Sequence, residues 1–504
     1  MSQTDTDVII VGAGPVGLML ACELRLAGVE CLVLEKSTEP TDQSRALGFT
    51  SRTIETFDQR GLLPRFGGFD TIQYGHFGGV PMDFTEVPDS SYGAKGVPQS
   101  LTVAVLNAWA DELGAPVRRG WEVTDLEDGE ERVAVEVTGP EGPARLTAKY
   151  LVGCDGARST IRKRTGIGFP GHDAAIELDF AEVVGVQVRP RPNGERSEDG
   201  LVLAFQQGPD IFRVTYYDRH LVPRKADETP SFEEVSDTWK RLTGEDISHG
   251  TPRWIGKFTD ATRQAAEYRR GRVFLAGDAA HIHLPIGGQG MSAGVQDAVN
   301  LGWKLAAAIH GTAPADLLDT YHSERHPVGE RVITNTLTQR MLYISGSEMQ
   351  PMRDLFGELA QFPAVRKHLI DMITGLDIRY ETGPGEHPLL GRRLPDAELT
   401  EVAGRDGAAG EDGTSSTFAL LHPARPFVLD LTGDAQVRAA AARWAGRVDT
   451  VSARPAGGAE GLFGGVSALL VRPDGYLAWV GTTGTGAEGL TEALTRWFGV
   501  PVAD

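Results

Sequence analysis

The chain has 504 residues, of which 41% are hydrophobic and 23% are charged, and it carries a formal net charge of −20. This length exceeds what one hydrophobic core normally serves, so we expect about two or three globular domains. The acidic excess argues against a nucleic-acid-binding protein, which needs a basic face, and against a protein that binds anionic membrane surfaces.

The first residues, MSQTDTD, are polar and acidic and lack the basic and apolar regions of a signal peptide. No apolar run in the sequence is long enough to span a bilayer. The three cysteines, Cys22, Cys31 and Cys154, are odd in number, lie in apolar segments and form no CxxC pair. We therefore expect a cytoplasmic protein with reduced, structural thiols.

The chain opens with a predicted strand, helix and strand in close succession. The first strand is Val8–Val11, the helix covers Leu18–Ala27, and the second strand covers Glu30–Leu34. The first turn reads GAGPVG, and the second strand ends at an acidic residue. A GxGxxG pattern alone is weak evidence, but this full context predicts a dinucleotide-binding βαβ unit.

Each residue of this fingerprint has a physical role. Gly12 allows the tight turn, Gly14 lets the backbone approach a pyrophosphate, and Gly17 lets the helix pack closely on the strand. Glu35 can accept hydrogen bonds from ribose hydroxyls. That role favours an unphosphorylated adenosine ribose, as in FAD or NAD, at this unit.

Two later stretches are less specific signals. Arg45 is a candidate phosphate or ring contact, although a solvated surface arginine is the simpler interpretation. Further on, a predicted strand at Tyr150–Cys154 leads into Asp155-Gly156 and a helix start, which could meet a phosphate but is more often a turn with an N-cap. Between them we predict helices at Ser51–Gly61 and Leu101–Leu113 and strands at Trp121–Leu126, Arg132–Val137 and Ala144–Ala148.

Residues 176–255 change to an alternating pattern that predicts an antiparallel sheet. Its strands are expected at Glu177–Val188, Leu201–Gln206 and Phe212–Tyr217, and a helix at Ser231–Leu242 follows. Aromatic side chains would make this sheet a floor or lid for a substrate. The glycine- and aromatic-rich stretch 67–97 could contribute to the same pocket or could be an ordinary hydrophobic hairpin. The candidate pocket residues are Phe77 from that stretch and Phe205, Phe212 and Tyr216 from the sheet.

A second glycine-rich turn follows the strand Val273–Ala276. The strand runs into Gly277-Asp278, the segment Pro285–Gly290 reads PIGGQG, and a helix starts near Met291. A strand, a glycine-rich turn and a helix N-terminus together can place backbone N–H groups against an anion or a polarised ring. On its own this stretch is as compatible with an ordinary turn as with a ligand site.

Helical patterns continue to about Met372, and GPGEHPLLGRRLP at Gly383–Pro395 reads as a linker. His322 and His326 lie in the helical part without an HExxH pattern, so we predict no metal site. The remaining residues predict a small α/β domain with a hairpin turn at Pro473-Asp474-Gly475. Its strands are expected at Phe418–Leu421, Phe427–Leu431, Val448–Ser452, Ala468–Val471 and Tyr476–Gly481, and its helices at Arg438–Ala445 and Leu490–Phe498.

Three motifs now stand together: GxGxxG with Glu35, Asp155-Gly156, and Gly277-Asp278 followed by PIGGQG. In this combination the chain resembles the FAD-dependent aromatic hydroxylases of the para-hydroxybenzoate hydroxylase type, the group A flavoprotein monooxygenases. The resemblance covers the whole chain. The stretches Val97–Gly114, His281–Leu305 and His387–Leu394 are most similar to the branch that oxygenates aromatic polyketides, such as the angucycline and anthracycline hydroxylases.

The resemblance implies an α/β fold with three parts. A Rossmann-type FAD-binding domain would comprise residues 1–175 and, with additional helices, residues 271–385. An antiparallel-sheet substrate domain would comprise residues 176–270, with a contribution from residues 70–97. A C-terminal thioredoxin-like α/β domain at residues 395–504 would lack the CxxC pair and could not carry out dithiol chemistry.

The resemblance also implies the site residues. The fingerprint glycines and Glu35 would hold the ADP half of FAD, Arg45 and Gln99 would lie along its pyrophosphate and ribityl chain, and Asp278 would bind the ribityl hydroxyls. Residues expected to contact the cofactor are Gly12, Gly14, Pro15, Gly17, Glu35, Lys36, Arg45, Gln99, Asp155, Gly156, Gly277, Asp278, Pro285, Gly287, Gly288, Gly290 and Met291. Those expected to face the reactive flavin ring are Pro285, Gly288, Ser292 and Arg45.

Two positions depart from the family pattern. Val103 stands where glutamate is frequent, and Ser292 stands where asparagine is frequent after GGQGM. Val103 would loosen a polar anchor, and Ser292 would change contacts near the flavin.

The implied activity is that of an FAD-dependent monooxygenase which hydroxylates a polycyclic aromatic polyketide through a flavin C4a-hydroperoxide. FAD would be bound tightly but not covalently, and NAD(P)H, preferably NADPH, would bind transiently because the chain has only one complete dinucleotide fingerprint. We expect O2 as co-substrate and a monomer or homodimer. Baeyer–Villiger oxygenation, a dehydrogenase that avoids O2 and a non-catalytic flavin-fold binding protein remain the alternatives.

Overall fold

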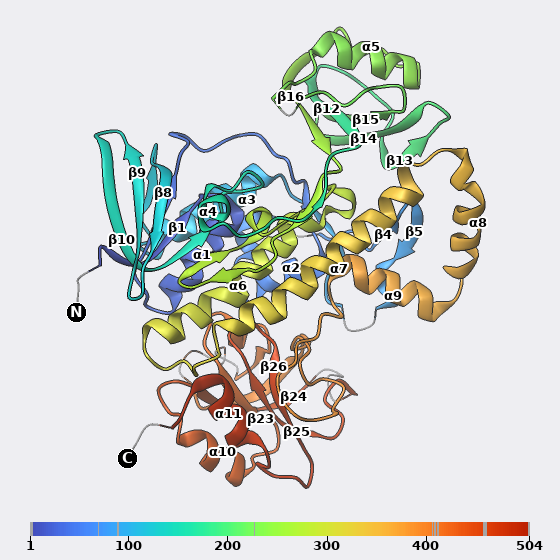
Figure 1. The fold of residues 1–504 in the computed structure, drawn as a ribbon. Coiled ribbons are helices and arrows are strands. Elements are labelled where there is room, and N and C mark those ends of the chain that lie inside the picture. Colours follow the sequence, from blue (N-terminus) through green and yellow to red (C-terminus); the bar gives the residue numbers. More distant parts are fainter. Residues whose placement is uncertain are drawn as a thin grey trace.

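The computed structural model describes residues 4–68, 70–87, 90–225, 227–405, 407, 410, 413–456 and 461–501. Figure 1 shows a central α/β body, a sheet capped by one helix above it, and a separate α/β unit below it that contains the C-terminal part of the chain. None of the helices in these ranges is both long and apolar enough to cross a membrane. The predicted α/β class is confirmed, with its parallel central sheet, its antiparallel sheet and its C-terminal α/β unit.

The central sheet has the strand order β18-β19-β10-β1-β2-β7. Its four parallel pairings bring β19, β10, β1, β2 and β7 into one direction, because helices make the crossings between them. Helix α1 packs against both α3 and α6. The elements are β1 (Thr6–Val11), α1 (Pro15–Leu26), β2 (Cys31–Glu35), α3 (Gln99–Glu112), β7 (Val117–Arg119), β10 (Gly142–Gly153), α4 (Thr160–Thr165), β18 (Arg269–Arg270), β19 (Val273–Leu275) and α6 (Gln289–Ile309).

The two strands predicted at Ala144–Ala148 and Tyr150–Cys154 are one strand, β10. Its first half pairs antiparallel with β9 (Val133–Gly139), which also pairs with β8 (Glu122–Asp128), and its second half pairs parallel with β1. No glycine or proline interrupts Ala144–Val152, so the chain continues through Lys149 without a turn. The two predicted segments are therefore the two pairing regions of a single strand.

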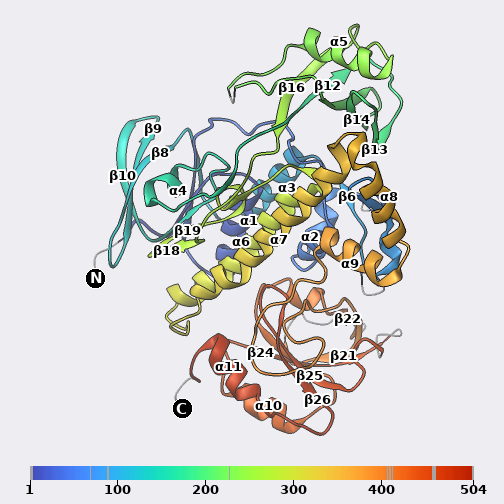
Figure 2. The ribbon, with the colours of Figure 1, turned by 45° about the vertical axis from the view of Figure 1, so that its right-hand side comes forward.

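The upper sheet has the order β13-β14-β15-β12-β16, and α5 covers one of its faces (Figure 2). Alternation along the strands decides which side chains meet the helix. Phe212, Val214 and Tyr216 point to the α5 side and form a core with Trp239, whereas Phe205 and Arg213 are paired on the other face. The elements are β12 (Glu177–Val184), β13 (Arg191–Arg196), β14 (Gly200–Gly208), β15 (Ile211–Asp218), α5 (Phe232–Thr243) and β16 (Thr251–Thr259).

The stretch 70–97 forms a hairpin of its own, outside the five-stranded sheet. Phe77 is buried there among side chains of α7, α8 and α9, and its ring stacks on Phe356 with centroids 5.5 Å apart. The helical pattern predicted as far as about Met372 corresponds, in this part of the fold, to three helices. The elements are β4 (Tyr74–Phe77), β5 (Val80–Asp83), α7 (Asp319–Ile344), α8 (Gln350–Leu359) and α9 (Pro363–Thr374).

Short elements connect these parts. They are β3 (Gly48–Phe49), α2 (Ser51–Asp58), η1 (Leu63–Phe66), η2 (Phe84–Glu86), β6 (Lys95–Gly96), β11 (Gly171–His172), β17 (Thr262–Gln264), η3 (Gly277–Ala279), β20 (His281–Ile282), η4 (Ile286–Gly288) and η5 (Ser347–Met349). The three cysteines are free thiols, as predicted, and burial raises the pKa of Cys31 to about 12.

The C-terminal unit contains a six-stranded sheet of order β22-β21-β24-β23-β25-β26. A parallel β23-α10-β24 unit is followed by the antiparallel pair β25–β26 and by α11, which is a thioredoxin-like arrangement. The elements are β21 (Glu398–Ala403), β22 (Ser415–Ser416), η6 (Ala419–Leu421), β23 (Phe427–Asp430), α10 (Ala435–Ala442), β24 (Asp449–Pro455), β25 (Val466–Val471), β26 (Leu477–Thr482) and α11 (Leu490–Phe498).

The strand predicted at Phe418–Leu421 is wrong, because this segment is a 3-10 turn in which the amide of Leu421 donates to the carbonyl of Phe418 at 2.9 Å. A run of four apolar residues has no period that separates a buried strand from a buried turn. The strand β21 was not predicted. Its alternating residues begin just after the linker, in a polar stretch with few β-branched side chains.

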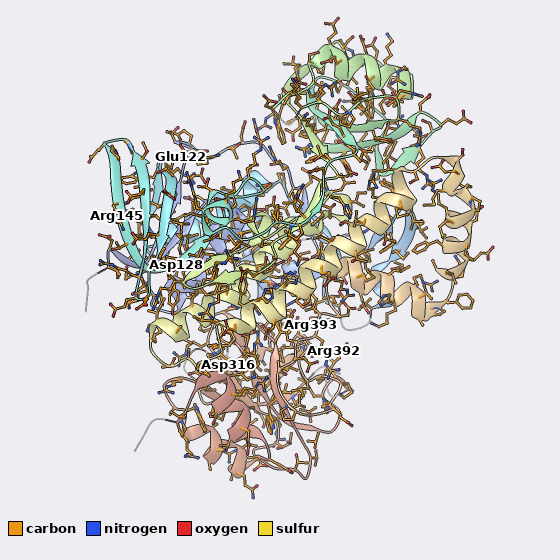
Figure 3. The ribbon with its side chains drawn as sticks, in the orientation of Figure 1. Glu122, Asp128, Arg145, Asp316, Arg392 and Arg393 are labelled. Atoms are coloured by element: carbon orange, nitrogen blue, oxygen red, sulfur yellow. The ribbon has the colours of Figure 1, made fainter. Side chains whose placement is uncertain are left out.

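Buried ion pairs hold the C-terminal unit against the central body. Arg393 lies at this junction in Figure 3, and its Nη1 is 3.0 Å from Oε1 of Glu55 in α2. The turn Pro473-Asp474-Gly475 between β25 and β26 reaches into the same region. Its carbonyls at Pro473 and Asp474 accept hydrogen bonds from Arg60 at 2.8 Å and from Arg52 at 3.1 Å. The junction therefore fixes the unit to the helices that flank the candidate site.

Candidate cofactor and active site

Four of the predicted residues lie at one edge of the central sheet. Strand pairing places Val11 beside Leu34 and Gly153, and Gly153 beside Leu275. The residues that follow these strand ends are therefore neighbours: Glu35, Gly12, Cys154 with Asp155, and Gly277. The carboxyl edge of a parallel sheet is where such folds bind nucleotides.

The three fingerprint glycines differ in what a side chain would meet. A Cβ on Gly12 would lie 2.4 Å from the carbonyl oxygen of Cys154, and one on Gly17 would lie 2.0 Å from the carbonyl oxygen of Gly12. A Cβ on Gly14 would meet no atom of the described residues within 4 Å. Gly12 and Gly17 are thus required by the packing of the protein itself, while Gly14 borders open space at the start of α1.

Helix α1 begins at Gly14 without a side-chain cap, and Pro15 occupies its first turn. The first amides of an uncapped helix lack partners within the helix and carry the positive end of its dipole. A pyrophosphate bound beside Gly14 would accept from them. This arrangement fits the predicted cofactor-binding role of Gly14, Pro15 and Gly17.

The carboxylate of Glu35 is oriented by two backbone amides. Its Oε2 accepts from Ala13 at 2.9 Å and its Oε1 from Ser37 at 2.8 Å. Carboxylate oxygens have further lone pairs for ribose hydroxyls. Lys36 follows at the same strand end with an exposed side chain.

Asp155 lies beside the Gly12 turn, since a Cβ on Gly12 would come within 3.2 Å of its Cα. Its Oδ2 accepts from the amides of Thr160 and Ile161 at the start of α4, at 2.6 and 3.1 Å. Its Oδ1 is buried without a hydrogen-bond partner among the described residues. Burial raises the pKa of this carboxyl, against the lowering effect of hydrogen bonds from Ser159 and the helix amides. An unsatisfied buried oxygen fits a site that a polar ligand completes. Gly156 follows in a left-handed turn with φ +76°.

Gln99, Arg45 and Asp278 come together although they are far apart in the sequence. Gln99 starts α3, and its Oε1 accepts from the amide of Ala46 at 3.2 Å, which fixes the segment that carries Arg45. The positive charge of Arg45 acts on Asp278 and, with His281, opposes the burial that raises the pKa of the Asp278 carboxyl. The Asp278 side chain remains accessible to solvent although protein atoms surround it. It therefore lies in a recess, where polyol hydroxyls could reach it.

The PIGGQG segment makes an open turn into α6. Gly287 and Gly288 are left-handed, with φ +74° and +65°, and a Cβ on Gly288 would meet no protein atom within 4 Å. Helix α6 begins after Gly288 without a side-chain cap. Pro285 and Gly288 are exposed, and Gly290 and Met291 are partly buried. The turn thus presents backbone rather than side chains, as a flat ring would require.

His283 was not predicted as part of this turn. Its Nδ1 is 2.9 Å from the carbonyl of Leu284, so Nδ1 donates and Nε2 remains as an acceptor. Burial lowers the pKa of His283 to about 4, and the ring is therefore neutral near pH 7. A Cβ on Gly290 would lie 3.3 Å from its Nε2. A histidine within a loop carries no pattern that would have identified it.

Ser292 is bound to the N-terminal end of α2 by its side chain and by its backbone. Its Oγ accepts from the amide of Thr50 at 3.2 Å, and its carbonyl accepts from Thr53 at 3.3 Å. Ser292 is buried, whereas the exposed positions of the turn are Pro285 and Gly288. These contacts favour a structural role for Ser292. Val103 is likewise buried in the main hydrophobic core, where it packs as an apolar residue of α3.

Replacing Ser292 with alanine is expected to lower the free energy of unfolding by about 1 to 3 kcal/mol, because the buried amide of Thr50 loses its acceptor. The flavin absorption spectrum should not change. Denaturant unfolding and visible spectra of Ser292→Ala and of Ser292→Thr, which keeps the hydroxyl, test this. An altered flavin spectrum with unchanged stability would place Ser292 at the ring instead.

The sheet face opposite α5 bears aromatic side chains, of which Tyr217 and Phe258 pack against the residues beside this turn. Leu178 and Leu201 of that face pack with Leu284 and Ile286, which flank Pro285. Phe180 lies in the same face and contacts Trp254 edge-on and Phe258 by stacking, with centroids 4.6 and 4.7 Å apart. The partly buried aromatic residues of this face are Phe205, Tyr217, Trp254 and Phe258.

Phe212 and Tyr216 belong to the core under α5, and Phe77 to the core of the β4–β5 hairpin. Their positions argue against substrate contact, and Tyr217, Trp254 and Phe258 take their place as candidates beside Phe205. The alternation of side chains along the strands was the signal that could have separated Phe212 and Tyr216 from Phe205 and Tyr217.

Arg213 ties this face to the Arg45 segment. Its Nη2 donates to the carbonyl of Ser44 and to Oε1 of Glu182, each at 2.5 Å. Its guanidinium carbon lies 4.8 and 5.0 Å from the ring centroids of Phe180 and Trp254. One buried arginine thus links the sheet that would contact the substrate to the loop that would contact FAD.

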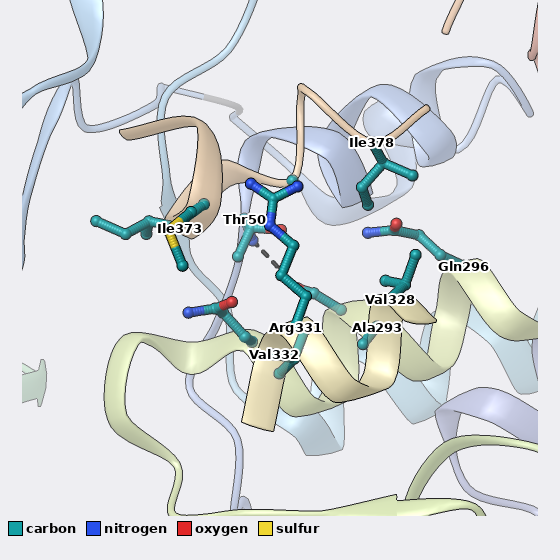
Figure 4. A pocket seen from close by; sticks show the side chains of 12 residues that line it. Thr50, Ala293, Gln296, Val328, Arg331, Val332, Ile373 and Ile378 are labelled. Carbon is teal, nitrogen blue, oxygen red and sulfur yellow. Dashed lines mark hydrogen bonds between the residues drawn. The ribbon is translucent and has the colours of Figure 1, made fainter. Parts of the chain in front are cut away.

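A small cavity lies on another side of α6 (Figure 4). Thr50, Gln296, Val328 and Arg331 are among its lining residues. Ser292 also lines it, whereas a Cβ on Gly294 of α6 would lie against Val16 and Gly277. The cavity therefore contains Ser292 but none of the other predicted site residues. Neither is there, in the described ranges, a cluster of three or more His, Cys, Asp or Glu side chains placed to hold a metal ion.

Two protein-family models match the chain. The model described as FAD binding domain matches residues 5–336, and the model described as aromatic-ring hydroxylase, C-terminal, matches residues 387–501. A 12-dehydrotetracycline 5-monooxygenase/anhydrotetracycline 6-monooxygenase from Streptomyces rimosus is 45% identical over 513 residues, which cover 98% of this chain and 99% of the relative.

Solved structures of similar proteins cover nearly the whole chain. That of CabE, an aromatic hydroxylase from angucycline biosynthesis, is 52% identical with a TM-score of 0.93 over 99% of this chain and 100% of the other. That of AlpK is 57% identical with a TM-score of 0.90 and covers 100% of both chains. These similarities extend over the strand-edge residues, the sheet above them and the C-terminal unit alike.

Proposed function

The chain belongs to the FAD-dependent aromatic-ring hydroxylases, and from this we propose that it inserts one oxygen atom from O2 into a polycyclic aromatic polyketide, at the expense of NAD(P)H. The observation that carries the proposal is that Glu35, the Gly12–Gly17 turn and Gly277-Asp278 follow neighbouring strand ends, with the charge of Arg45 acting on Asp278. The open Gly287–Gly288 turn follows Asp278 along the chain.

The residues present fit FAD. Gly12, Gly14, Gly17 and Glu35 would hold the ADP half, with Lys36 and Asp155-Gly156 beside it, and Arg45, Gln99 and Gly277-Asp278 would follow the pyrophosphate and ribityl chain. The segment Pro285–Met291 would face the flavin ring. When bound, FAD supplies the electron transfer and the activation of O2. The positive end of the α6 dipole would stabilise negative charge on the ring.

An aromatic polyketide fits the face of the upper sheet that borders this turn. Phe205, Tyr217, Trp254 and Phe258 are partly buried there, and aromatic faces of this kind stack on planar rings. The similar proteins whose names mention tetracycline and angucycline compounds support the same substrate class. Arg213 and Glu182 would hold the face in place.

NAD(P)H would bind transiently, since the single fingerprint at Gly12–Gly17 is taken by FAD, and we favour NADPH. The active form would be a monomer or a homodimer. Hydroxylation is favoured over Baeyer–Villiger oxygenation because the similar CabE is described as an aromatic hydroxylase.

The purified protein is expected to contain FAD and to oxidise NADPH with matching O2 consumption when anthraquinone or angucyclinone compounds are supplied. Oxygen monitoring during NADPH oxidation across such a panel tests this, with NADH as the comparison. A hydroxylated ring in the product NMR supports the proposal, whereas an expanded ring identifies Baeyer–Villiger chemistry. NADPH oxidation without O2 uptake would identify a dehydrogenase, and no stimulation by any compound would favour a binding protein.

A further inference from the structure

The loop Gly277–His281, which carries Asp278, is closed by one buried carboxylate of α6. Oδ2 of Asp297 accepts hydrogen bonds from the amide of Gly277 at 3.1 Å and from Nε2 of His281 at 2.9 Å. These two donors belong to the first and the last residue of the loop. A single oxygen atom therefore holds both ends, and Asp278 lies between them.

Asp297 is itself fixed. Its side chain is fully buried, and its Oδ1 accepts from Nε of Arg325 at 2.7 Å. Arg325 also donates to the carbonyl of Ala293 at 3.1 Å and to the hydroxyl of Tyr380 at 2.8 Å. Burial alone would raise the pKa of the Asp297 carboxyl, but Arg325 and His281 outweigh it and lower the pKa. The loop is thus bound to a carboxylate whose ionised form is favoured and whose two oxygens both accept hydrogen bonds.

The surroundings of Gly277 leave no room for a side chain. The residue is left-handed at φ +61°, and a Cβ there would lie 2.8 Å from Cγ2 of Val16. A Cβ on Gly294 would lie 3.1 Å from the Cα of Gly277. Within the loop, the carbonyl of Ala279 accepts a hydrogen bond from Arg162 at 2.8 Å. Asp278 is the polar side chain of this loop that stays accessible to solvent.

We propose that Asp297 is a positioning residue for FAD. By holding Gly277 and His281, it presents the Asp278 carboxylate to the ribityl hydroxyls and contributes to cofactor affinity without touching the cofactor. This role rests on the assignment of Asp278 to FAD and does not depend on which substrate the enzyme oxygenates.

The variant Asp297→Asn tests the role. An amide oxygen has two lone pairs, so at least one of the three donors at Gly277, His281 and Arg325 loses its acceptor. We expect the Kd of the apoprotein for FAD, measured by quenching of flavin fluorescence, to rise at least about tenfold. The visible circular dichroism of bound flavin should change as well.

Asp474→Asn is the matched control. Asp474 is a buried carboxylate that also binds α6, through Asn300 at 3.0 Å, but it has no hydrogen bond to the Gly277–His281 loop. Both variants should lose thermal stability, and Asp474→Asn should bind FAD as the unchanged protein does. Equal loss of FAD affinity in both variants would overturn the proposal, because it would show a general effect of destabilisation.

Should Asp297→Asn not fold, the double variant Asp297→Asn with Arg325→Met removes both partners of the buried ion pair, which generally costs less stability than removing one. It is expected to fold and still to bind FAD at least about tenfold more weakly. Unchanged FAD affinity and circular dichroism in either folded variant would contradict the role. Because these measurements need no turnover, they remain decisive even if no polyketide proves to be a substrate.

Discussion

Replacing Gly14 with alanine is expected to leave the fold intact and to weaken FAD binding by about 10- to 100-fold. Gly14 has φ −77° and ψ 179°, a conformation that alanine adopts freely, and its added Cβ would meet no protein atom within 4 Å. The methyl group would instead occupy the space in which the pyrophosphate approaches the first turn of α1. FAD content after purification and titration of the apoprotein with FAD measure the effect.

Gly17→Ala is the informative comparison. Its Cβ would lie 2.0 Å from the carbonyl oxygen of Gly12, so the variant is expected to lose stability as well as FAD. Circular dichroism and thermal unfolding separate the two outcomes. If Gly14→Ala bound FAD with unchanged affinity, the pyrophosphate could not lie at this turn and the cofactor assignment would be wrong.

The second large effect is expected at the junction with the C-terminal unit, where Glu324→Gln should lower the free energy of unfolding by about 3 to 5 kcal/mol. Glu324 of α7 accepts from Arg472 at 2.6 and 2.8 Å and from Lys304 of α6 at 2.7 Å, and all three side chains are buried. A neutral glutamine would remove the negative charge that the buried cations of Arg472 and Lys304 share. Denaturant unfolding measures the loss.

The exposed pair Arg454–Glu401 provides the control, because its side chains are 61% and 69% exposed. Glu401→Gln should change the free energy of unfolding by no more than about 0.5 kcal/mol. A similarly small effect of Glu324→Gln would show that the junction does not contribute to stability.

The junction also predicts a dependence on pH. Burial by itself would raise the pKa of the Glu324 carboxyl, but Arg472 and Lys304 outweigh it and lower the pKa to about 2. Since the folded-state pKa is depressed, this stabilisation is complete above the ordinary glutamate pKa and is lost as the pH falls toward 2. The difference in free energy of unfolding between the unchanged protein and Glu324→Gln should therefore shrink as the pH falls toward 2.

That the candidate cofactor residues lie together could be predicted because each lies in a contiguous stretch with its own chemistry. Gly12–Gly17, Asp155-Gly156 and Gly277-Asp278 each follow a strand, and parallel strands bring their ends to one edge without any knowledge of tertiary contacts. Which aromatic side chains share the sheet face opposite α5 was predicted only in part. Phe205 and Tyr217 share one face, while Phe212 and Tyr216, two of the three pocket residues taken from the sheet, have the opposite parity along their strand.

The supporting residues could not be predicted because their partners are distant in sequence. Asp297 reads as one polar position of an amphipathic helix, yet it binds Gly277, His281 and Arg325, up to 28 residues away. Ser292 stands in a recognisable motif, but only the contact with Thr50, 242 residues earlier, shows what its hydroxyl does. Arg213 and Glu324 likewise acquire their roles only when separate sheets and helices meet.

The central claim is that this chain transfers oxygen from O2 to a polycyclic aromatic polyketide with FAD as its cofactor. The most direct measurement is a turnover with isotopically labelled O2, NADPH and an angucyclinone or anthraquinone substrate, followed by mass spectrometry and NMR of the product. We expect one labelled oxygen atom on an aromatic ring and loss of the product when FAD is removed. A product whose new oxygen comes from water, or one that forms equally well without FAD, would contradict it.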